Sequence, residues 1–429
     1  MNTKRILLIQ PNAEGHFNKL YAKFFLIPPL SLQQFVTCTP SNYEVKIVDE
    51  RFEKIEYDHN YDLIGLTFLT KDAFRAYEIA DEFRSMGKKV VLGGIHPTLL
   101  PNEAKQHADS VITGEAEFTW QKLLKDFEKG KIKPFYKSKE KVKPKNIPPA
   151  KRYNKFFMAG IQATRGCPFK CDFCQRTALN DTVHRKREID EVIKELKSIE
   201  SKIIWFRDAS LTIDVEYTKK LLRRMIEEKL NKRWFAYATT TTLGKDDELL
   251  KLASKAGCVA WMVGFETISN YNFPKNRGAD FSKVVEKVGK HGMGICGSFI
   301  FGFDNDTPET FDRTYEEVSS WELESAEFNI LTPLPKTPLF EKLDREKRIL
   351  TKDWSKYNLA NVVFQPKNLT AGELKEGVKK ISQKFYAIPS MLKRMTKPAN
   401  KSKNLLSILF RISTNLDLRY FHKLRVTKF

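Results

Sequence analysis

The sequence predicts an α/β protein built on two successive parallel sheets and followed by a helical tail. Short apolar, strand-like segments alternate with helical segments over residues 1–135, and they alternate again over residues 155–345. Strands that alternate with helices form parallel sheets covered by those helices. Residues 136–154 are rich in Lys and Pro without periodicity and predict a linker, while 346–429 predict a basic, helical C-terminal region.

The composition indicates a folded, cytoplasmic protein. Of the 429 residues, 41% are hydrophobic and 12% aromatic, which excludes a disordered chain and suits two or three domains. No apolar run reaches the roughly 18 residues that span a membrane, and the apolar start is too short for a signal peptide. Clustered cysteines without a signal peptide favour a reducing compartment. The net charge of +21 predicts an anionic partner.

The first unit predicts a doubly wound sheet of the Rossmann or flavodoxin type. The amphipathic helix expected over 71–86 ends at Gly87, and the expected strands are 5–10, 44–49, 61–69, 88–93 and 110–113. Ligands of such sheets bind beyond the carboxyl ends of the strands. Polar residues, glycines and prolines occupy those ends, at 10–12, Thr67, 93–98 and 114–115.

The stretch 161–175, IQATRGCPFKCDFCQ, carries three cysteines in the spacing C-x3-C-x2-C. They are Cys167, Cys171 and Cys174. Three thiolates on one loop predict an iron–sulfur cluster with one iron open to a ligand. A structural zinc knuckle is the alternative, but zinc favours two pairs of ligands and the nearest spare ligand is His184. The remaining cysteines are expected in the core: Cys38, Cys258 and Cys296.

Residues 155–345 repeat the strand–helix alternation six times. The expected strands are 160–164, 202–207, 233–239, 258–265, 295–301 and 327–331. The expected helices are 188–200, 215–230, 246–256, 282–291 and 308–321. Six units are fewer than the eight of a closed barrel and therefore predict an open, partial (β/α)6 barrel. The cysteine loop follows the first strand, so it is expected at the carboxyl face where barrel active sites form.

The residues CPFKCDFC resemble the signature of the radical S-adenosylmethionine (SAM) enzymes, with an aromatic residue just before the third cysteine. The resemblance implies that the three cysteines hold a [4Fe-4S] cluster. It further implies that the open iron binds the amino and carboxylate groups of SAM and that reduction cleaves SAM to a 5′-deoxyadenosyl radical. The implied SAM-binding set is Phe173, Asp208, Thr239, Gly264, Glu266, Ser298 and Thr332.

Three segments depart from the family pattern. The segment RDAS, which begins at Arg207, stands where the family usually has D-D-x-x. In the loop that resembles T-P-x-P-G-T-P, Lys336 replaces the glycine. The fourth-strand element GFET resembles the family's G-x-E-S, with Thr267 in the last place.

The first unit resembles the cobalamin-binding domain that precedes the barrel in one large class of radical SAM enzymes. That class often shows G-G-x-H-P-T followed by D-x-V-x-x-G-E, which here read GGIHPT from Gly93 and DSVITGE from Asp109. The resemblance implies cobalamin contacts at Asn12, Thr67, Gly93, Gly94, His96, Pro97, Thr98, Gly114 and Glu115. The cobalt-ligating D-x-H-x-x-G pattern is absent, and His16 stands outside that frame. The sequence therefore leaves open whether this domain has lost the ability to bind cobalamin.

The C-terminal region holds more than half of the net charge. Between Lys379 and Phe429 there are thirteen Lys or Arg residues and one acid, Asp417. Apolar residues recur there at helical spacing: Leu405, Leu409, Ile412, Leu416, Tyr420 and Leu424. Such a helix either packs on the barrel or lies on anionic lipid. No nucleic-acid-binding motif is visible, so no nucleic acid is expected.

Together these patterns predict a cytoplasmic radical SAM enzyme, peripheral on the inner face of the membrane, that modifies an unactivated carbon. We expect cobalamin-dependent methylation of a lipid-like or other apolar small molecule, with a flavodoxin or ferredoxin as electron donor. One alternative is a cobalamin-independent enzyme that closes rings or joins carbons. The other is a non-catalytic iron–sulfur protein that binds membrane or RNA. No catalytic residue beyond the cofactor contacts is assigned.

Overall fold

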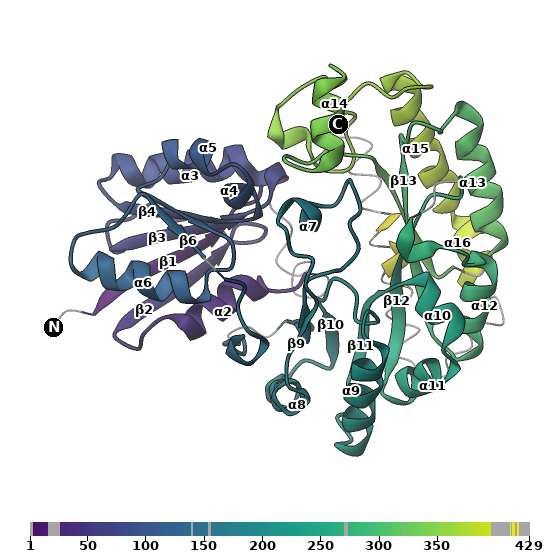
Figure 1. Cartoon of the computed structure of the whole chain (residues 1–429), viewed down its shortest axis with the longest axis horizontal. Helices are drawn as coiled ribbons and strands as arrows, with labels where there is room; N and C mark the ends of the chain where they lie inside the picture. Colours follow the sequence, from purple (N-terminus) through teal and green to yellow (C-terminus); the bar gives the residue numbers. More distant parts are fainter. Residues whose placement is uncertain are drawn as a thin grey trace.

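The computed structural model describes residues 3–15, 26–138, 140–152, 156–269, 273–321 and 323–395, and positions 412, 414–416, 418 and 419. Figure 1 shows two lobes side by side, the first formed by the N-terminal residues in purple and blue, the second by the rest of the chain. Each lobe is built on a six-stranded parallel sheet. Within the described residues, no helix is both long and apolar enough to cross a membrane.

The sheet of the first lobe has the strand order β2-β1-β3-β4-β5-β6. Its strands are β1 (Lys4–Gln10), β2 (Tyr43–Asp49), β3 (Leu63–Phe68), β4 (Lys89–Gly94), β5 (Ser110–Thr113) and β6 (Phe135–Lys137). The order reverses beside β1, as in a flavodoxin-type sheet, so the predicted doubly wound fold is confirmed. The strand β6 extends this sheet into the predicted linker, which also contains the 3-10 turn η2 (Pro144–Asn146).

Helices cover both faces of this sheet because its strands are apolar on both sides. Ile6 and Leu8 of β1 belong to one core cluster, while Leu7 and Ile9 belong to the cluster on the other face. The covering elements are α2 (Leu30–Cys38), η1 (Thr70–Asp72), α3 (Ala73–Ser85), α4 (Ile95–Leu99), α5 (Pro101–Gln106) and α6 (Glu117–Glu128). The GGIHPT segment therefore runs directly from β4 into the short helix α4.

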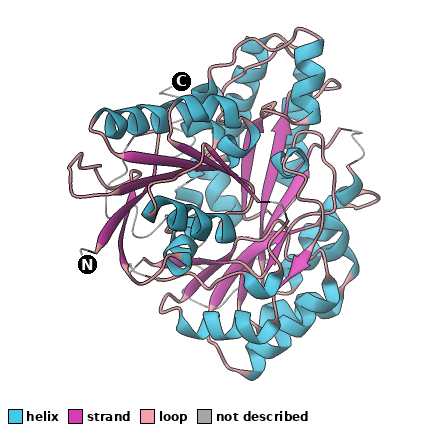
Figure 2. Cartoon of the chain, turned by 60° about the vertical axis from the view of Figure 1, so that its left-hand side comes forward, coloured by secondary structure: helices cyan, strands magenta, loops and turns pink. Residues whose placement is uncertain are grey.

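The second sheet has the order β14-β13-β12-β11-β10-β7, with every neighbouring pair parallel. Its strands are β7 (Met158–Ile161), β10 (Ile203–Phe206), β11 (Arg233–Ala238), β12 (Cys258–Glu266), β13 (Gly294–Phe301) and β14 (Ser325–Ile330). An open sheet of six sequential parallel strands confirms the predicted partial barrel. Figure 2 shows its strands fanned beside those of the first sheet, with helices on the outer side.

Amphipathic helices cover the outer face of the barrel because their apolar stripes complete its core. Val192 of α8 and Leu221 of α9 are fully buried there, and so are Val288 of α12 and Val318 of α13. The helical elements are α8 (Ile189–Ser198), α9 (Val215–Glu227), α10 (Thr240–Lys245), α11 (Asp247–Lys255), η3 (Pro274–Asn276), α12 (Phe281–Lys290), α13 (Pro308–Ser320) and α14 (Pro338–Arg345).

Polar contacts fasten the lobes together at two places that the sequence did not connect. After α14 the chain returns to the first lobe at the 3-10 turn η4 (Trp354–Lys356), where the Trp354 indole donates to both Glu103 carboxylate oxygens over 3.1 Å. Near the cysteine loop, the Arg185 guanidinium donates to both oxygens of Glu115 over 2.6 and 2.9 Å. The relative position of the two sheets is thus fixed by contacts distant in sequence.

The described part of the C-terminal region packs against the barrel. Helix α15 (Ala371–Phe385) adds buried residues to the barrel core, and α16 (Ile388–Met395) follows it. Asn415 is buried and donates to the Glu324 carbonyl over 3.1 Å, and Leu418 packs on the barrel core. The following residues of the predicted amphipathic helix lie outside the described residues: Leu405, Leu409, Asp417, Tyr420 and Leu424.

Candidate active site

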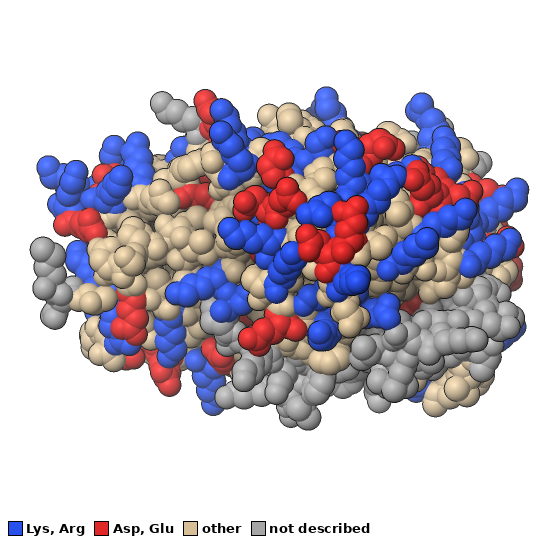
Figure 3. Space-filling view, turned by 90° about the horizontal axis from the view of Figure 1, so that it is seen from below, with Lys and Arg blue, Asp and Glu red and all other residues tan. Residues whose placement is uncertain are grey.

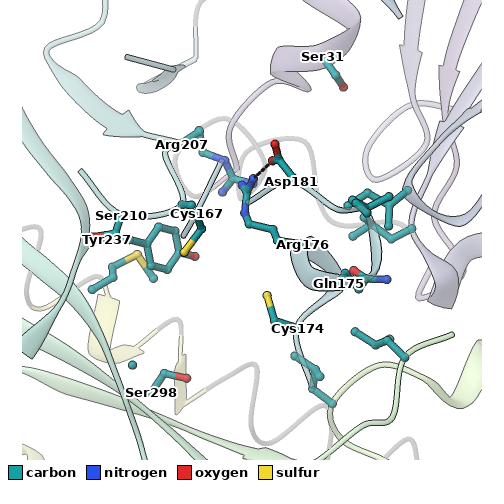
Figure 4. Close-up of a pocket in the computed structure, with 18 of the residues that line it drawn as sticks. Ser31, Cys167, Cys174, Gln175, Arg176, Asp181, Arg207, Ser210, Tyr237 and Ser298 are labelled. Carbon is teal, nitrogen blue, oxygen red and sulfur yellow. Dashed lines mark hydrogen bonds and ion pairs between the residues drawn. The ribbon is translucent and has the colours of Figure 1, made fainter. Parts of the chain in front are cut away.

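One cavity of about 1130 Å³ lies between the carboxyl ends of the two sheets. The first lobe contributes Gln10, Thr67 and Gly114 to its wall, and the barrel contributes the cysteine loop and the ends of its strands. Figure 4 shows Ser31 of the first lobe across this space from Ser298 of the barrel. The cavity lies where the topology of both sheets gathers ligand-binding groups.

A short antiparallel pair closes the base of the cysteine loop. Its strands are β8 (Thr164–Arg165) and β9 (Arg185–Lys186). Gly166 follows β8 with a φ of +86°, and a β-carbon at this position would meet the Val183 carbonyl carbon at 2.8 Å. Both the left-handed backbone and the close approach require glycine here. The R-G-C segment can therefore turn sharply into the loop.

Backbone bonds inside the loop set the positions of the cysteines. The Cys167 amide donates to the Asp181 carbonyl over 2.9 Å, and the Thr177 hydroxyl donates to the Cys171 carbonyl over 2.8 Å. Helix α7 (Gln175–Ala178) begins directly after Cys174. The loop is thus held by its own main chain, so the thiols do not have to provide its structure.

The three thiols have surroundings that fit a cluster facing the cavity. Cys167, Cys171 and Cys174 are partly exposed and all line the cavity. Burial raises the pKa of Cys167 and raises that of Cys171 to about 11. Three partly exposed thiols on one loop, all facing the cavity, suit a [4Fe-4S] cluster held at its wall.

The candidate zinc ligand His184 and two of the other three cysteines lie outside the cavity, whereas Cys296 lines it. His184 does not line the cavity, and burial lowers its pKa. Cys38 and Cys258 are buried in the cores, as expected. The expectation for Cys296 is wrong, because this residue on β13 lines the cavity.

Asp208 supports the cysteine loop from behind the cavity wall. This fully buried carboxylate accepts hydrogen bonds from the Thr164 amide and, over 2.6 Å, from the Thr164 hydroxyl. Burial raises the pKa of Asp208 to about 6, while the bonds from Thr164 oppose that rise. Asp208 does not line the cavity, so it holds the start of the loop and does not reach a ligand.

Glu266 and Lys275 form an ion pair in the cavity wall. The Lys275 ammonium donates to the Glu266 carboxylate, and both side chains are largely buried. Burial alone would lower the pKa of Lys275, but Glu266 raises it overall. Gly264 makes room for the pair, since a β-carbon there would lie 2.7 Å from the Lys275 ammonium nitrogen. Glu266 itself has a φ of +65°, which turns its carboxylate back across Gly264.

The other residues expected to contact SAM line the same cavity from four separate segments. They are Phe173, Thr239, Ser298 and Thr332. The Phe173 ring stands edge-on to Phe273 at a centroid distance of 5.7 Å, which fixes its orientation. The Asn329 amide donates to the Ser298 hydroxyl over 3.4 Å. Hydroxyls and an aromatic ring therefore meet beside the thiols, as a nucleoside requires.

The proline-rich loop after β14 braces the cysteine loop. Lys336 has a φ of +61°, a left-handed conformation that the glycine of the resembled T-P-x-P-G-T-P pattern would adopt without strain. The Thr337 hydroxyl caps α14 by accepting the Phe340 amide hydrogen over 3.1 Å. The Leu339 amide then donates to the Asp172 carbonyl over 3.1 Å. The helix start thus supports the backbone between the second and third cysteines.

Five of the positions expected to contact cobalamin line the cavity from the first lobe. They are Thr67, Gly94, Thr98, Gly114 and Glu115. Gly94 has a φ of +106°, and a β-carbon there would lie 2.8 Å from the Phe68 backbone. The Thr98 hydroxyl donates to the Gly94 carbonyl over 2.7 Å and accepts from the Gly114 amide over 3.0 Å. Gly94 and Gly114 form a glycine floor, a surface without side chains that is bordered by the Thr67 and Thr98 hydroxyls. Such a surface fits the flat ring of a cobalamin.

The remaining positions of that set face away from the cavity or are otherwise engaged. Asn12, Gly93, His96 and Pro97 do not line the cavity. His96 is fully buried, with one ring nitrogen 3.1 Å from a Glu103 oxygen and the other 3.3 Å from the Thr70 hydroxyl. Glu115 lines the cavity, but Arg185 engages both of its oxygens. No histidine is among the described cavity-lining residues, and His16 lies outside the described part of the chain.

Several cavity residues were not selected from the sequence. They are Arg176, Arg207, Tyr237, Lys275 and Glu327. Burial raises the pKa of Tyr237 to about 12, so this phenol stays protonated. Arg207 and Tyr237 end their strands at the carboxyl face, a position that could have selected them. Lys275 follows β12 by nine residues, and no sequence pattern connects it with Glu266.

Comparisons with known proteins support this arrangement. Residues 161–318 match the radical SAM superfamily, and residues 33–124 match the B12 binding domain. The chain is 34% identical over 423 residues to bacteriochlorophyllide d C-12(1)-methyltransferase of Chlorobaculum tepidum, covering 92% of this chain and 91% of that protein. It is 32% identical over 424 residues to bacteriochlorophyllide d C-8(2)-methyltransferase of the same organism, covering 92% and 93%.

The fold is also similar to a solved structure of this kind. The radical SAM methyltransferase TsrM from Kitasatospora setae, with cobalamin and a [4Fe-4S] cluster bound, superposes with a TM-score of 0.68 at 15% identity, covering 99% of this chain and 98% of that one. The order of the two matched regions is the one that the sequence predicts, first the B12-binding lobe and then the barrel. The predicted cofactors, a [4Fe-4S] cluster, SAM and cobalamin, are those of the two matched families. The chain belongs to the radical SAM enzymes that carry an N-terminal B12-binding domain.

Proposed function

We propose that this enzyme transfers a methyl group to an unactivated carbon of a large apolar substrate, with a chlorin ring as the favoured class. The single observation that supports it best is the shared cavity, in which the cysteine loop of the barrel faces the glycine floor of the first lobe. The two methyltransferase relatives described above carry bacteriochlorophyllide d in their names. A cavity of about 1130 Å³ has room for more than one cofactor.

When bound, the cluster and SAM supply a radical that abstracts hydrogen, and cobalamin supplies the methyl group. In this proposal Cys167, Cys171 and Cys174 hold the cluster. The SAM contacts are Phe173, Thr239, Gly264, Glu266, Ser298 and Thr332, and the cobalamin contacts are Thr67, Gly94, Thr98 and Gly114. The protein's part is to orient these groups and to exclude water, which would quench a reactive intermediate. Apolar wall residues such as Met262 and Ile300 suit that exclusion.

The test is a turnover assay on anaerobically reconstituted enzyme. The reaction contains SAM labelled in its methyl group, bacteriochlorophyllide d and a strong reductant, with and without cobalamin. We expect labelled product, 5′-deoxyadenosine and S-adenosylhomocysteine together, and only when cobalamin is present. Deoxyadenosine with an unlabelled, ring-closed product would favour the cyclase alternative. A loaded cluster with no turnover of SAM would contradict the enzymatic proposal.

We also propose peripheral contact of the C-terminal region with anionic membranes and reduction by a flavodoxin or ferredoxin. On the face seen in Figure 3, basic and acidic side chains are intermingled over the described residues. Large apolar side chains are exposed on the C-terminal region, with Ile388, Leu392 and Leu416 exposed by 55%, 56% and 53%. Such residues beside lysines suit a lipid interface.

Flotation with phosphatidylglycerol vesicles tests the membrane contact. The double variant Ile388→Ser, Leu392→Ser in α16 should lose binding, whereas Leu350→Ser, exposed by 53% in the segment before η4, should keep it. Equal binding of both variants would contradict the contact. For the electron donor, a flavodoxin with its reductase should replace the chemical reductant in the turnover assay.

A further inference from the structure

One basic side chain of the cavity has no acidic partner. Arg207 follows β10, and its amide donates to the Ile161 carbonyl over 2.7 Å, which fixes its backbone at the carboxyl face. Its guanidinium lies over the Trp205 ring, with the central carbon 4.1 Å from the ring centroid. The side chain lines the cavity and is accessible from it. Over the described residues, no hydrogen bond or ion pair engages this guanidinium.

The other basic residues of the cavity wall each have a carboxylate within 4.0 Å. Arg51 donates to Asp49 over 2.9 Å, Arg165 pairs with Glu117 at 2.6 Å, and Arg176 pairs with Asp181 at 2.9 Å. Lys141 lies 4.0 Å from Asp181, and Lys275 pairs with Glu266. Figure 4 shows Arg207 on the same side of the cavity as the Arg176–Asp181 pair. Among the six basic side chains that line the cavity, Arg207 is therefore the one without a carboxylate within 4.0 Å in the described part of the chain.

The Arg207 guanidinium is available to an anion that enters the cavity. Its side chain is exposed and lines the cavity, so it keeps its water until a ligand displaces that water. Its planar fork of donors matches a carboxylate, which it can bind through two parallel hydrogen bonds. The Trp205 ring holds the fork in one orientation without consuming its donors.

The neighbouring acid does not neutralise Arg207. Asp208 is buried, accepts a hydrogen bond from the Thr164 hydroxyl and does not line the cavity. The charge that this strand end presents to the cavity is therefore the positive charge of Arg207.

We propose that Arg207 is the anchor for a carboxylate on the substrate. The inference rests on the proposed function and deepens it, because it adds an anionic group to the apolar body of the substrate. A chlorin that ends in a free carboxylate meets both requirements. Two cofactors of the proposed function also carry anions, namely the SAM carboxylate and the cobalamin phosphate. We assign Arg207 to the substrate because SAM would be held at the cysteine loop and cobalamin on the glycine floor of the first lobe, whereas Arg207 stands on the barrel wall after β10.

The test compares acid and ester forms of the same ligand on the enzyme loaded with cluster, SAM and cobalamin. One pair is bacteriochlorophyllide d and its methyl ester, and the other is laurate and methyl laurate, with Kd measured by titration without reductant. The wild type should bind each acid at least about tenfold more tightly than its ester, as expected for a charge-assisted bidentate contact. Arg207→Gln should bring that ratio close to one, and Arg207→Lys should restore part of it.

The control variant is Lys141→Gln, which removes a positive charge from the same cavity wall. It should leave the acid-to-ester ratio near the wild-type value, since Lys141 already lies near Asp181. If only the laurate pair shows an Arg207-dependent ratio, the anchor stands and the chlorin body of the proposed function fails. A wild-type ratio near one for both pairs would overturn the inference. A loss of SAM or cobalamin affinity in Arg207→Gln, with the ratio intact, would overturn it as well.

Discussion

Replacing Gly166 by alanine should open the base of the cysteine loop. Two costs combine at this position. An L-residue at a φ of +86° costs about 1–2 kcal/mol relative to glycine. In addition, the new β-carbon would lie 2.8 Å from the Val183 carbonyl carbon and closer still to its oxygen, a backbone group that cannot rotate away. Steric strain against main chain adds about 2 kcal/mol or more.

Gly87 is a matched control that separates the two costs. It has a similar φ of +75°, but a β-carbon there would meet nothing within 4 Å. Gly87→Ala should therefore cost only the conformational part, about 1 kcal/mol of unfolding free energy. The difference between the two variants, about 2 kcal/mol or more, reports the contact with Val183.

The assay combines urea denaturation with iron and sulfide analysis after anaerobic reconstitution. We expect Gly166→Ala to lower the unfolding free energy by about 3 kcal/mol and to retain much less iron than Gly87→Ala. The loss of iron follows because Cys167 comes directly after the displaced residue. Equal stability and equal iron content in the two variants would refute the view that the Gly166 turn positions the first thiol.

Three further predictions concern the cavity wall. Cys171→Ser should abolish the absorbance of the reconstituted cluster while leaving the far-ultraviolet circular dichroism unchanged, since the loop is held by main-chain bonds. Glu266→Gln should lower the unfolding free energy by about 3 kcal/mol in urea denaturation, because it leaves the Lys275 ammonium without its carboxylate; no loss would contradict the pairing. Asp208→Asn should change the pH dependence of stability. The folded pKa of about 6 lies above the ordinary value of 3.8, so the wild type loses about 3 kcal/mol as pH rises from 4 to 7, and this loss should be absent from the asparagine variant.

The fold was predictable because periodicity and cysteine spacing are local signals. The barrel strands are short apolar runs in the sequence. The loop after the first strand contains the three cysteines, whose spacing alone predicts an iron–sulfur cluster. What the sequence could not specify was the direction of individual side chains. His96 belongs to a ligand-like glycine motif, yet its ring turns inward, where the Glu103 carboxylate of the following helix α5 lies 3.1 Å from a ring nitrogen.

The sequence also could not predict which residues the charged side chains contact. Asp208 reads as a strand-end ligand, but its contact with Thr164 depends on a pairing between β7 and β10 that only the folded sheet provides. Lys275 meets Glu266 because the chain bends back after β12 at Gly264 and Glu266, where the register with β13 shifts. In the sequence, Arg207 stands out only as a departure from the family pattern. That it lacks an acidic partner can be recognised only when all the residues around the cavity are known.

The indole of Trp354 on Glu103 has a consequence for the biogenesis of the enzyme. One wall of the cavity comes from residues such as Thr67, and another comes from Thr332, so neither half of the chain forms the site alone. The contact between the lobes at Trp354 is made by a residue that is synthesised after the last barrel strand, β14. A growing chain therefore has no complete cofactor site until that point. We expect cobalamin insertion to follow synthesis of the barrel, and a chain that ends before Trp354 should retain cobalamin less well than the full chain.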